Sequence, residues 1–172
     1  AGQAAPATRA EPSRPAPLAT PRGTPSAPAA YGPYTLERLG LSATLSVPAE
    51  WSLSRTERGV EFGDPTGTLL LRVEIVPRPA ADARAAWEAA EPAFRRSLRD
   101  YRRLGLVDVR GVGESAADLS FTFTRDGITR QVIDRGILVD GLSLAIYFSA
   151  PRESYARTAV VFYRANRDLR LS

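Results

Sequence analysis

The sequence contains no cysteine, histidine, methionine or lysine, so all 23 of its basic residues are arginine. Without Cys and His, zinc sites of the usual kind and Ser-His-Asp or Cys-His catalysis are excluded. Without Lys, a P-loop, a Schiff base and a Ser-Lys dyad are excluded as well. Only carboxylates, Tyr, Ser, Thr and Arg remain as reactive groups. We therefore expect no catalytic residues, no metal site and no cofactor.

The sequence also has no apolar run near the ~18 residues that a membrane-spanning helix needs, so we expect no span within it. It does not begin with methionine, and we expect a fragment or a processed product. The combination of many Ala, Arg, Gly and Pro with no Lys is typical of a high-GC genome, such as that of an actinobacterium.

The net charge of +4 does not indicate a nucleic-acid partner. Residues 34–172 contain 20 Arg and 18 acidic residues, so this part of the chain is nearly balanced. No cluster of basic residues alternates with aromatic residues in the way that nucleic-acid surfaces require. We therefore expect no nucleic acid among the partners.

The N-terminal segment 1–33 differs from the rest in composition. It contains 8 of the 14 prolines, and its only large apolar residues are Leu18 and Tyr31. Such a segment buries too little surface to offset the entropy of ordering. We expect 1–33 to be a disordered Pro/Ala-rich linker and 34–172 to be a single α+β domain.

The stretch from Ala117 to Ala150 organises the predicted domain. Two Asp-Gly pairs, at 126–127 and 140–141, separate three β-rich runs. Asp-Gly between alternating apolar residues is a strong signal for a β-hairpin. The sequence therefore predicts an antiparallel meander of three strands.

A long helix is expected over 82–103, with Asp82 as its N-cap and an apolar stripe that includes Trp87 and Phe94. Pro92 is expected to kink it or to split it into 82–90 and 91–103, and Gly105 is a natural stop signal. Further elements are expected from the same periodicities: strands over 41–47, 60–62, 69–76 and 106–112, a helix after Pro151 and a short closing strand near 169–171.

The middle strand of the meander is the first candidate for a binding site, because polar residues interrupt its alternation. Arg130, Asp134 and Arg135, together with Tyr147 of the next strand, are the candidate ligand-binding residues. The alternative is ordinary cross-strand pairing on a solvated face. An enzyme would need two convergent carboxylates, such as Asp134 with Glu74 or with Asp118.

A second candidate site is a cluster of arginines near the end of the long helix. One interpretation is a solvated helix face. The other is an anion patch for phosphate-rich polymers, acidic lipid head groups or an acidic partner. The residues of this candidate patch are Arg95, Arg96, Arg99, Arg102 and Arg103.

Several short strings, taken in the predicted order of elements, resemble a known family. They are Val47-Pro48-Ala49-Glu50-Trp51, Phe121-Thr122-Phe123, Asp134-Arg135-Gly136 and Ala145-Ile146-Tyr147-Phe148-Ser149-Ala150-Pro151. This layout over 34–172 resembles the C-terminal extracytoplasmic domain of actinobacterial membrane serine/threonine protein kinases, and secreted lipoproteins of the same PsbP-like fold.

The resemblance implies an αβα sandwich with a central antiparallel sheet of about six or seven strands. It implies a non-catalytic, extracytoplasmic ligand-binding or interaction domain, held to the cell membrane by a segment upstream of the linker. Its partner would be an unidentified extracytoplasmic ligand or cell-envelope component, and a homodimer stays open. The alternative is a free secreted lipoprotein or carrier. Kinase motifs are absent from the sequence, so the resemblance brings no catalytic residues.

Overall fold

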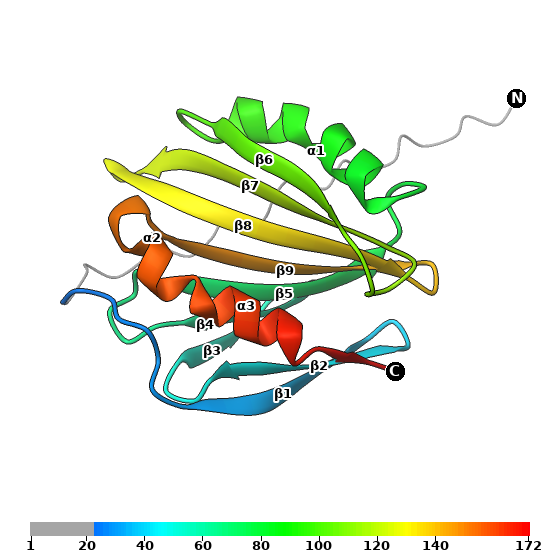
Figure 1. Cartoon of the computed structure of the whole chain (residues 1–172), viewed down its shortest axis with the longest axis horizontal. Helices are drawn as coiled ribbons and strands as arrows, with labels where there is room; N and C mark the ends of the chain where they lie inside the picture. Colours follow the sequence, from blue (N-terminus) through cyan, green and yellow to red (C-terminus); the bar gives the residue numbers. More distant parts are fainter. Residues whose placement is uncertain (1–22) are drawn as a thin grey trace, which may run out of the picture.

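The computed structural model describes residues 23–172, and a seven-stranded antiparallel sheet forms its centre (Figure 1). This confirms the predicted α+β class and the predicted size of the sheet. In spatial order the strands are β3 (Ser52–Arg55), β4 (Gly59–Gly63), β5 (Leu70–Pro77), β9 (Leu142–Pro151), β8 (Ile128–Val139), β7 (Ser115–Arg125) and β6 (Arg102–Val109).

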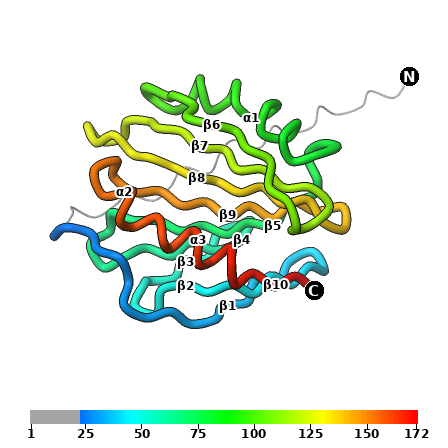
Figure 2. Tube along the Cα trace, in the orientation of Figure 1, coloured from blue at the N-terminus to red at the C-terminus, as the bar shows by residue number. Residues whose placement is uncertain are grey.

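A smaller sheet of three strands packs beside the first. Its strands are β1 (Tyr31–Arg38), β2 (Leu41–Pro48) and the short C-terminal β10 (Arg170–Leu171), which lies along β2 (Figure 2). Of the predicted linker, residues 1–22 lie outside the described residues, whereas 31–33 form the start of β1. The folded part therefore begins three residues before the predicted boundary.

The predicted meander is present as β7, β8 and β9, joined by two tight hairpins. Both turns are Asp-Gly pairs with positive φ at each residue: 51° and 76° at Asp126 and Gly127, and 50° and 73° at Asp140 and Gly141. Two positive φ values are the requirement of a type I′ turn, whose twist matches that of the flanking strands. The turn residues thus explain the hairpins.

The long helix, α1, spans Ala83–Ser97 and is shorter than predicted. Its start is as expected, because Asp82 caps it by accepting a hydrogen bond of 2.8 Å from the backbone N–H of Ala85. It continues through Pro92 without a break. The chain then turns at Asp100, where φ is 55°, and enters β6 at Arg102. The expectation that 98–103 is helical is wrong, because this segment turns back to pair with β7.

Helices cover both faces of the large sheet, which gives the predicted αβα sandwich (Figure 1). On one face, called here the α1 face, Trp87 and Phe94 of α1 pack against Leu119 and Phe121 of β7. On the other, the α3 face, α2 (Arg152–Thr158) packs on β8 and β9, and α3 (Val160–Arg167) packs between β9 and β2 of the smaller sheet. Phe162 of α3 is fully buried there. Among the helices of residues 23–172, none has the length and apolar character to cross a membrane.

Candidate functional site

The pleat of β8 divides the four predicted ligand-binding residues between the two faces of the sheet. Successive side chains of a strand point to opposite faces. Arg130 and Asp134 lie on the α1 face with Tyr147 of β9, which is the direct cross-strand partner of Asp134. Arg135 lies on the α3 face. The structure therefore brings Asp134 and Tyr147 together and separates Arg135 from them.

Arg135 has a structural position on the α3 face. Its Nε and Nη2 donate hydrogen bonds of 2.7 and 2.8 Å to the two carboxylate oxygens of Asp118 on β7. Its guanidinium carbon lies 5.4 Å from the ring centroid of Phe162. Such a bidentate pair, stacked on a ring, holds β7, β8 and α3 together. Asp118 therefore cannot be the second carboxylate that an enzyme would need beside Asp134, because the two lie on opposite faces, whereas Glu74 shares the α1 face with Asp134.

Arg130 is also fixed by contacts within the fold. Its Nε donates to the hydroxyl of Ser149 at 2.8 Å, and its Nη2 donates to the backbone carbonyls of Thr68 and Ser149 at 2.7 and 3.2 Å. Burial lowers the pKa of its guanidinium. These bonds tie the β4–β5 loop to β8 and β9, so the contacts of Arg130 are those of a structural residue.

Four polar side chains form a straight row across four strands of the α1 face. The register places Glu61 of β4 opposite Arg72 of β5, Arg72 opposite Tyr147 of β9, and Tyr147 opposite Asp134 of β8. We call these residues the cross-strand row. Arg72 pairs with Glu61 at 2.6 Å (Nη2 to Oε1), and its guanidinium carbon lies 5.2 Å from the ring centroid of Tyr147. Arg72 therefore contacts both Glu61 and Tyr147, whereas Asp134, the fourth member, takes part in neither contact.

Asp134 is the one member of the cross-strand row whose carboxylate has no partner within residues 23–172. Its side chain is buried, with the residue 9% exposed, and its Oδ1 atom accepts no hydrogen bond there. Burial, and after it the neighbouring charge of Glu74, raise its pKa to about 7, while the charge of Arg72 opposes the shift. Buried carboxyls without partners are rare in folded proteins and gather at functional sites.

The position of Asp134 is set by where α1 ends its cover of the sheet. The helix packs over β6, β7 and β8, and the Trp87 indole donates a 3.0 Å hydrogen bond to the carbonyl of Ala117. The same ring lies on Gly136, where an added Cβ would come within 3.2 Å of it. Beyond β8 the α1 face is only half-buried at Arg72, Glu74 and Tyr147. Asp134 thus lies at the border between a covered apolar cluster and an open polar face.

The predicted anion patch is partly neutralised by a buried acid that the sequence reasoning did not consider. Glu91 of α1 is 7% exposed. It accepts hydrogen bonds from Arg95 Nη2 at 2.9 Å, from Arg103 Nη1 at 3.1 Å and from the Tyr101 hydroxyl at 3.1 Å. Two of the five arginines are thus paired with one carboxylate, although their own side chains stay exposed.

The remaining arginines of the candidate patch are spread over different surfaces. Arg99 lies 3.6 Å (Nε to Oδ2) from Asp100. Arg96 and Arg102 are exposed and form no ion pair within residues 23–172. Arg102 opposes Thr122 on the α3 face, whereas Arg103 opposes Phe121 on the α1 face. The five residues therefore do not form one continuous face.

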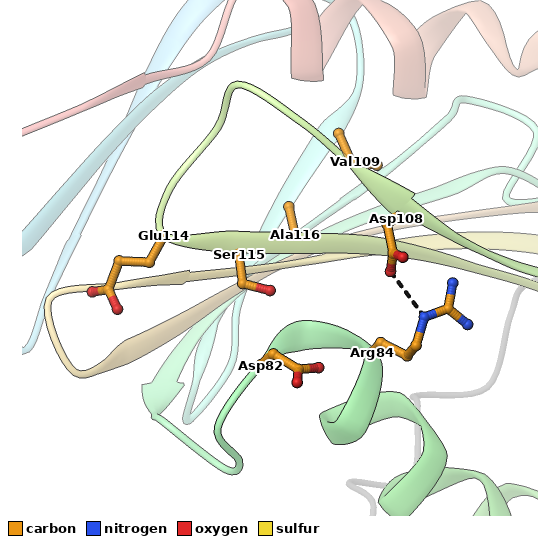
Figure 3. Close-up of a pocket in the computed structure, with 7 residues that line it drawn as sticks. All are labelled: Asp82, Arg84, Asp108, Val109, Glu114, Ser115 and Ala116. Carbon is orange, nitrogen blue, oxygen red and sulfur yellow. Dashed lines mark hydrogen bonds and ion pairs between the residues drawn. The ribbon is translucent and has the colours of Figure 1, made fainter.

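A hollow of about 350 Å³ lies at the N-terminal end of α1 (Figure 3). Its three acids already have partners: Asp82 caps the helix, Asp108 pairs with Arg84 at 3.0 Å, and Glu114 pairs with Arg78 at 2.6 Å. In Figure 3, Glu114 points away from Arg84. Across residues 23–172 no group of three acidic, His or Cys side chains is arranged to hold a metal ion. This hollow is a weaker candidate than the cross-strand row.

Comparison with models of protein families shows the family to which the chain belongs. The model of the serine/threonine kinase C-terminal domain family matches residues 43–170. The chain belongs to this family. The match confirms the relationship that the sequence strings suggested. Comparison with curated proteins gives no match.

Solved structures of the PsbP-like fold are similar to the chain. PsbP of the cyanobacterium Synechocystis sp. PCC 6803 has a TM-score of 0.62 at 12% identity, with 76% of this chain and 86% of that protein covered. LpqN of Mycobacterium tuberculosis has a TM-score of 0.59 at 14% identity, with 83% and 91% covered. At these identities the similarity establishes the fold alone, and it confirms the predicted PsbP-like fold.

Two residues of the candidate site, Glu61 and Arg72, were not predicted as site residues, and they complete the cross-strand row. Glu74, named from the sequence only as a possible carboxylate partner of Asp134 in an enzyme, lies near it and raises its pKa. The polar positions 72 and 74 in an otherwise apolar strand were the available signal. Their proximity to Asp134 depends on the pairing of β5 with β9, which lie far apart in the sequence.

Proposed function

We propose that this chain is the non-catalytic, extracytoplasmic sensor domain of a membrane serine/threonine protein kinase. It binds its ligand, or a component of the cell envelope, through the open part of the α1 face. The observation that carries the proposal is Asp134, a buried carboxyl whose Oδ1 is left without a partner beside a half-open polar row. Ligand sites commonly combine apolar walls with a few convergent polar groups of this kind.

Family and composition support the same proposal. The family occupies the C-terminal end of serine/threonine kinases. The Pro/Ala-rich segment that precedes the fold suits a spacer between a membrane anchor and the domain. Ligand binding in such an arrangement acts by shifting a conformational or dimer equilibrium across the membrane.

A second candidate is a free secreted lipoprotein or carrier of the same fold. It is favoured by the similarity to LpqN, a protein involved in cell envelope biogenesis. The sequence encoded directly upstream of Ala1 separates the two candidates. A kinase domain followed by one membrane helix supports the sensor, whereas a lipobox cysteine supports the lipoprotein.

The location of the domain is tested on the complete natural protein in its own membrane. Protease added to intact cells is expected to remove the domain while the kinase domain stays protected. Protection of the domain in intact cells, with cleavage only after lysis, would show that it is cytoplasmic and end the proposal.

Anion binding by the candidate anion patch is a separate proposal. Because the five arginines are divided between surfaces, it rests on the exposed members alone. Arg96 and Arg102 are the members that an anionic polymer would meet first, because both are exposed and unpaired within residues 23–172. A titration with polyphosphate is expected to show weaker binding for Arg96→Glu/Arg102→Glu than for Arg84→Glu, a reversal outside the patch. Equal binding by the two variants would mean that these arginines form an ordinary solvated surface and not an anion-binding site.

A further inference from the structure

We propose that one end of the domain is a docking surface for an anionic phospholipid bilayer. This end, called here the basic end, consists of the second half of α1 with the start of β6 (91–104), the β7–β8 hairpin (125–129) and the start of α2 (151–153). The inference rests on the membrane-tethered arrangement proposed above and names the surface that the domain turns towards the membrane. It is carried by the place where the chain enters the fold, by charge and by exposed apolar side chains.

The three segments of the basic end lie together at one end of strands β6 to β9 (Figure 1). The backbone N–H of Thr124 donates a 2.8 Å hydrogen bond to the carbonyl of Arg99, which joins the end of α1 to the hairpin. The hairpin and the start of α2 line a common hollow of about 510 Å³. An end of a sheet is bordered by side chains from both faces, so the division of the arginines between faces does not separate them here.

The described chain enters the fold at the same end. Segment 23–30, blue in Figures 1 and 2, lies at the end of the large sheet where α2 begins. Pro25 is buried, and its carbonyl accepts a 3.3 Å hydrogen bond from Nε of Arg157 in α2. A tether that enters the domain at residue 23 therefore arrives beside the basic end. Because a tether raises the effective concentration of a surface near its target, weak contacts suffice for docking.

Charge distinguishes the basic end from the opposite end of the same strands. The basic end contains seven arginines and four acids. At the opposite end, 77–83, 108–115 and 139–142 contain two arginines and four acids. Basic residues are attracted to an anionic membrane surface within about a Debye length, so the basic end is the one that such a surface attracts. Its exposed arginines that form no ion pair within residues 23–172 are Arg96, Arg102 and Arg152.

Exposed apolar side chains at the basic end favour a bilayer over a soluble anionic polymer. Leu104, at the register shift of β6, is 47% exposed, and Ile128 of the hairpin is 41% exposed. Ile128 also lines the hollow beside α2. Surfaces that lie on a membrane combine basic residues, which meet the head groups, with apolar side chains, which enter the boundary with the acyl chains. A soluble polyanion offers no such apolar layer.

The experiment places one fluorescent reporter at either end of the 172-residue chain. The sequence contains no cysteine, so a single introduced cysteine carries the only label. Ile128→Cys puts an environment-sensitive dye on the basic end, and Leu39→Cys puts it on the exposed β1–β2 turn at the opposite end (Figure 1). Vesicles of equal parts phosphatidylglycerol and phosphatidylcholine, at low ionic strength, are expected to cause a saturable blue shift at position 128 and none at position 39. Phosphatidylcholine vesicles should cause neither.

Two charge reversals on the same strand make the result specific. Arg102 is the first residue of β6 and Arg110 directly follows its last, and both are exposed and form no ion pair within residues 23–172. Sedimentation with the anionic vesicles is expected to show binding about tenfold weaker for Arg102→Glu than for the wild type. Arg110→Glu should stay within twofold of the wild type.

Three results would overturn the inference: no binding of the wild type to the anionic vesicles, equal loss in Arg102→Glu and Arg110→Glu, or a blue shift at position 39 without one at position 128. Binding of the wild type to polyphosphate but not to the vesicles would also overturn it and would assign the arginines to a soluble polymer. Each of these results leaves the sensor proposal to the protease experiment, which does not depend on contact with lipid.

Discussion

Asp134 and Arg135 are neighbours in the chain but lie on opposite faces of the seven-stranded sheet. Arg135 forms two hydrogen bonds to Asp118 on the α3 face, whereas Asp134 has no such partner within residues 23–172 on the α1 face. One residue is satisfied inside the fold, and the next carries an unsatisfied group. This contrast makes one strand both a scaffold and the edge of a candidate site.

Replacing Asp134 with Asn should stabilise the protein at alkaline pH. The carboxyl has a pKa of about 7 in the fold, against about 3.9 in an unfolded chain. Between these values the folded state binds more protons than the unfolded state, so stability falls as pH rises from about 4 to about 7 and is lowest above 7. Asparagine stays neutral, and we expect Asp134→Asn to exceed the wild type by about 2–4 kcal/mol at pH 8.

Urea unfolding at pH 4.5 and pH 8 checks this expectation. The difference between Asp134→Asn and wild type should be small at pH 4.5 and should grow towards pH 8. Asp108→Asn is the matched control, because Asp108 is exposed on β6 and pairs with Arg84. If the difference in unfolding free energy between Asp134→Asn and wild type were the same at both pH values, Asp134 would not be a buried carboxyl without a partner.

Asp118→Asn, in contrast to Asp134→Asn, should destabilise the protein. This change leaves the guanidinium of Arg135 without its charged partner where both side chains are mostly buried, 15% and 17% exposed. Removing one member of such a pair costs about 3 kcal/mol. Unfolding of Asp118→Asn at pH 7 should show this loss, and the double variant Asp118→Asn/Arg135→Gln should recover part of it. A loss below about 1 kcal/mol would mean that the pair contributes little.

The meander and the start of α1 could be predicted because their signals are local. Asp126-Gly127 and Asp140-Gly141 supply the positive φ values of their turns, and Asp82 caps the helix within three residues. The end of α1 could not be predicted in the same way. Arg102 and Arg103 are good helix formers, but pairing with β7 places them in a strand.

The candidate site depends on contacts that are distant in sequence. Period-two alternation alone separates Asp134 from Arg135, although a glycine inside a strand, such as Gly136, often marks a bulge. The register runs through Gly136 without interruption, opposite Ala117 and Ala145. The pairing of Arg72 with Tyr147 joins β5 to β9, and no local pattern specifies which of several similar strands become neighbours.

Glu91→Gln should lower the pKa of the Tyr101 hydroxyl. Burial and the hydrogen bond to the Glu91 carboxylate raise that pKa to about 12. Glutamine removes the negative charge while Arg95 and Arg103 remain nearby, so ionisation of Tyr101 becomes easier. Ultraviolet titration should show one tyrosine moving towards the ordinary value of about 10. Tyr101→Phe identifies the signal, and an unchanged titration in Glu91→Gln would mean that Glu91 does not control this hydroxyl.

Gly59→Ala should be among the most destabilising single-methyl additions in the chain. An added Cβ would lie 2.0 Å from the backbone carbonyl oxygen of Val73, in the fully buried centre of β5. A backbone atom cannot rotate away as a side chain can, so β4 and β5 would have to separate, and we expect a loss of about 3 kcal/mol. Gly32→Ala is the matched control, because nothing lies within 4 Å of its added Cβ on β1. Its urea midpoint should stay near that of the wild type. Equal midpoints for the two variants would show that β4 and β5 are not packed this closely.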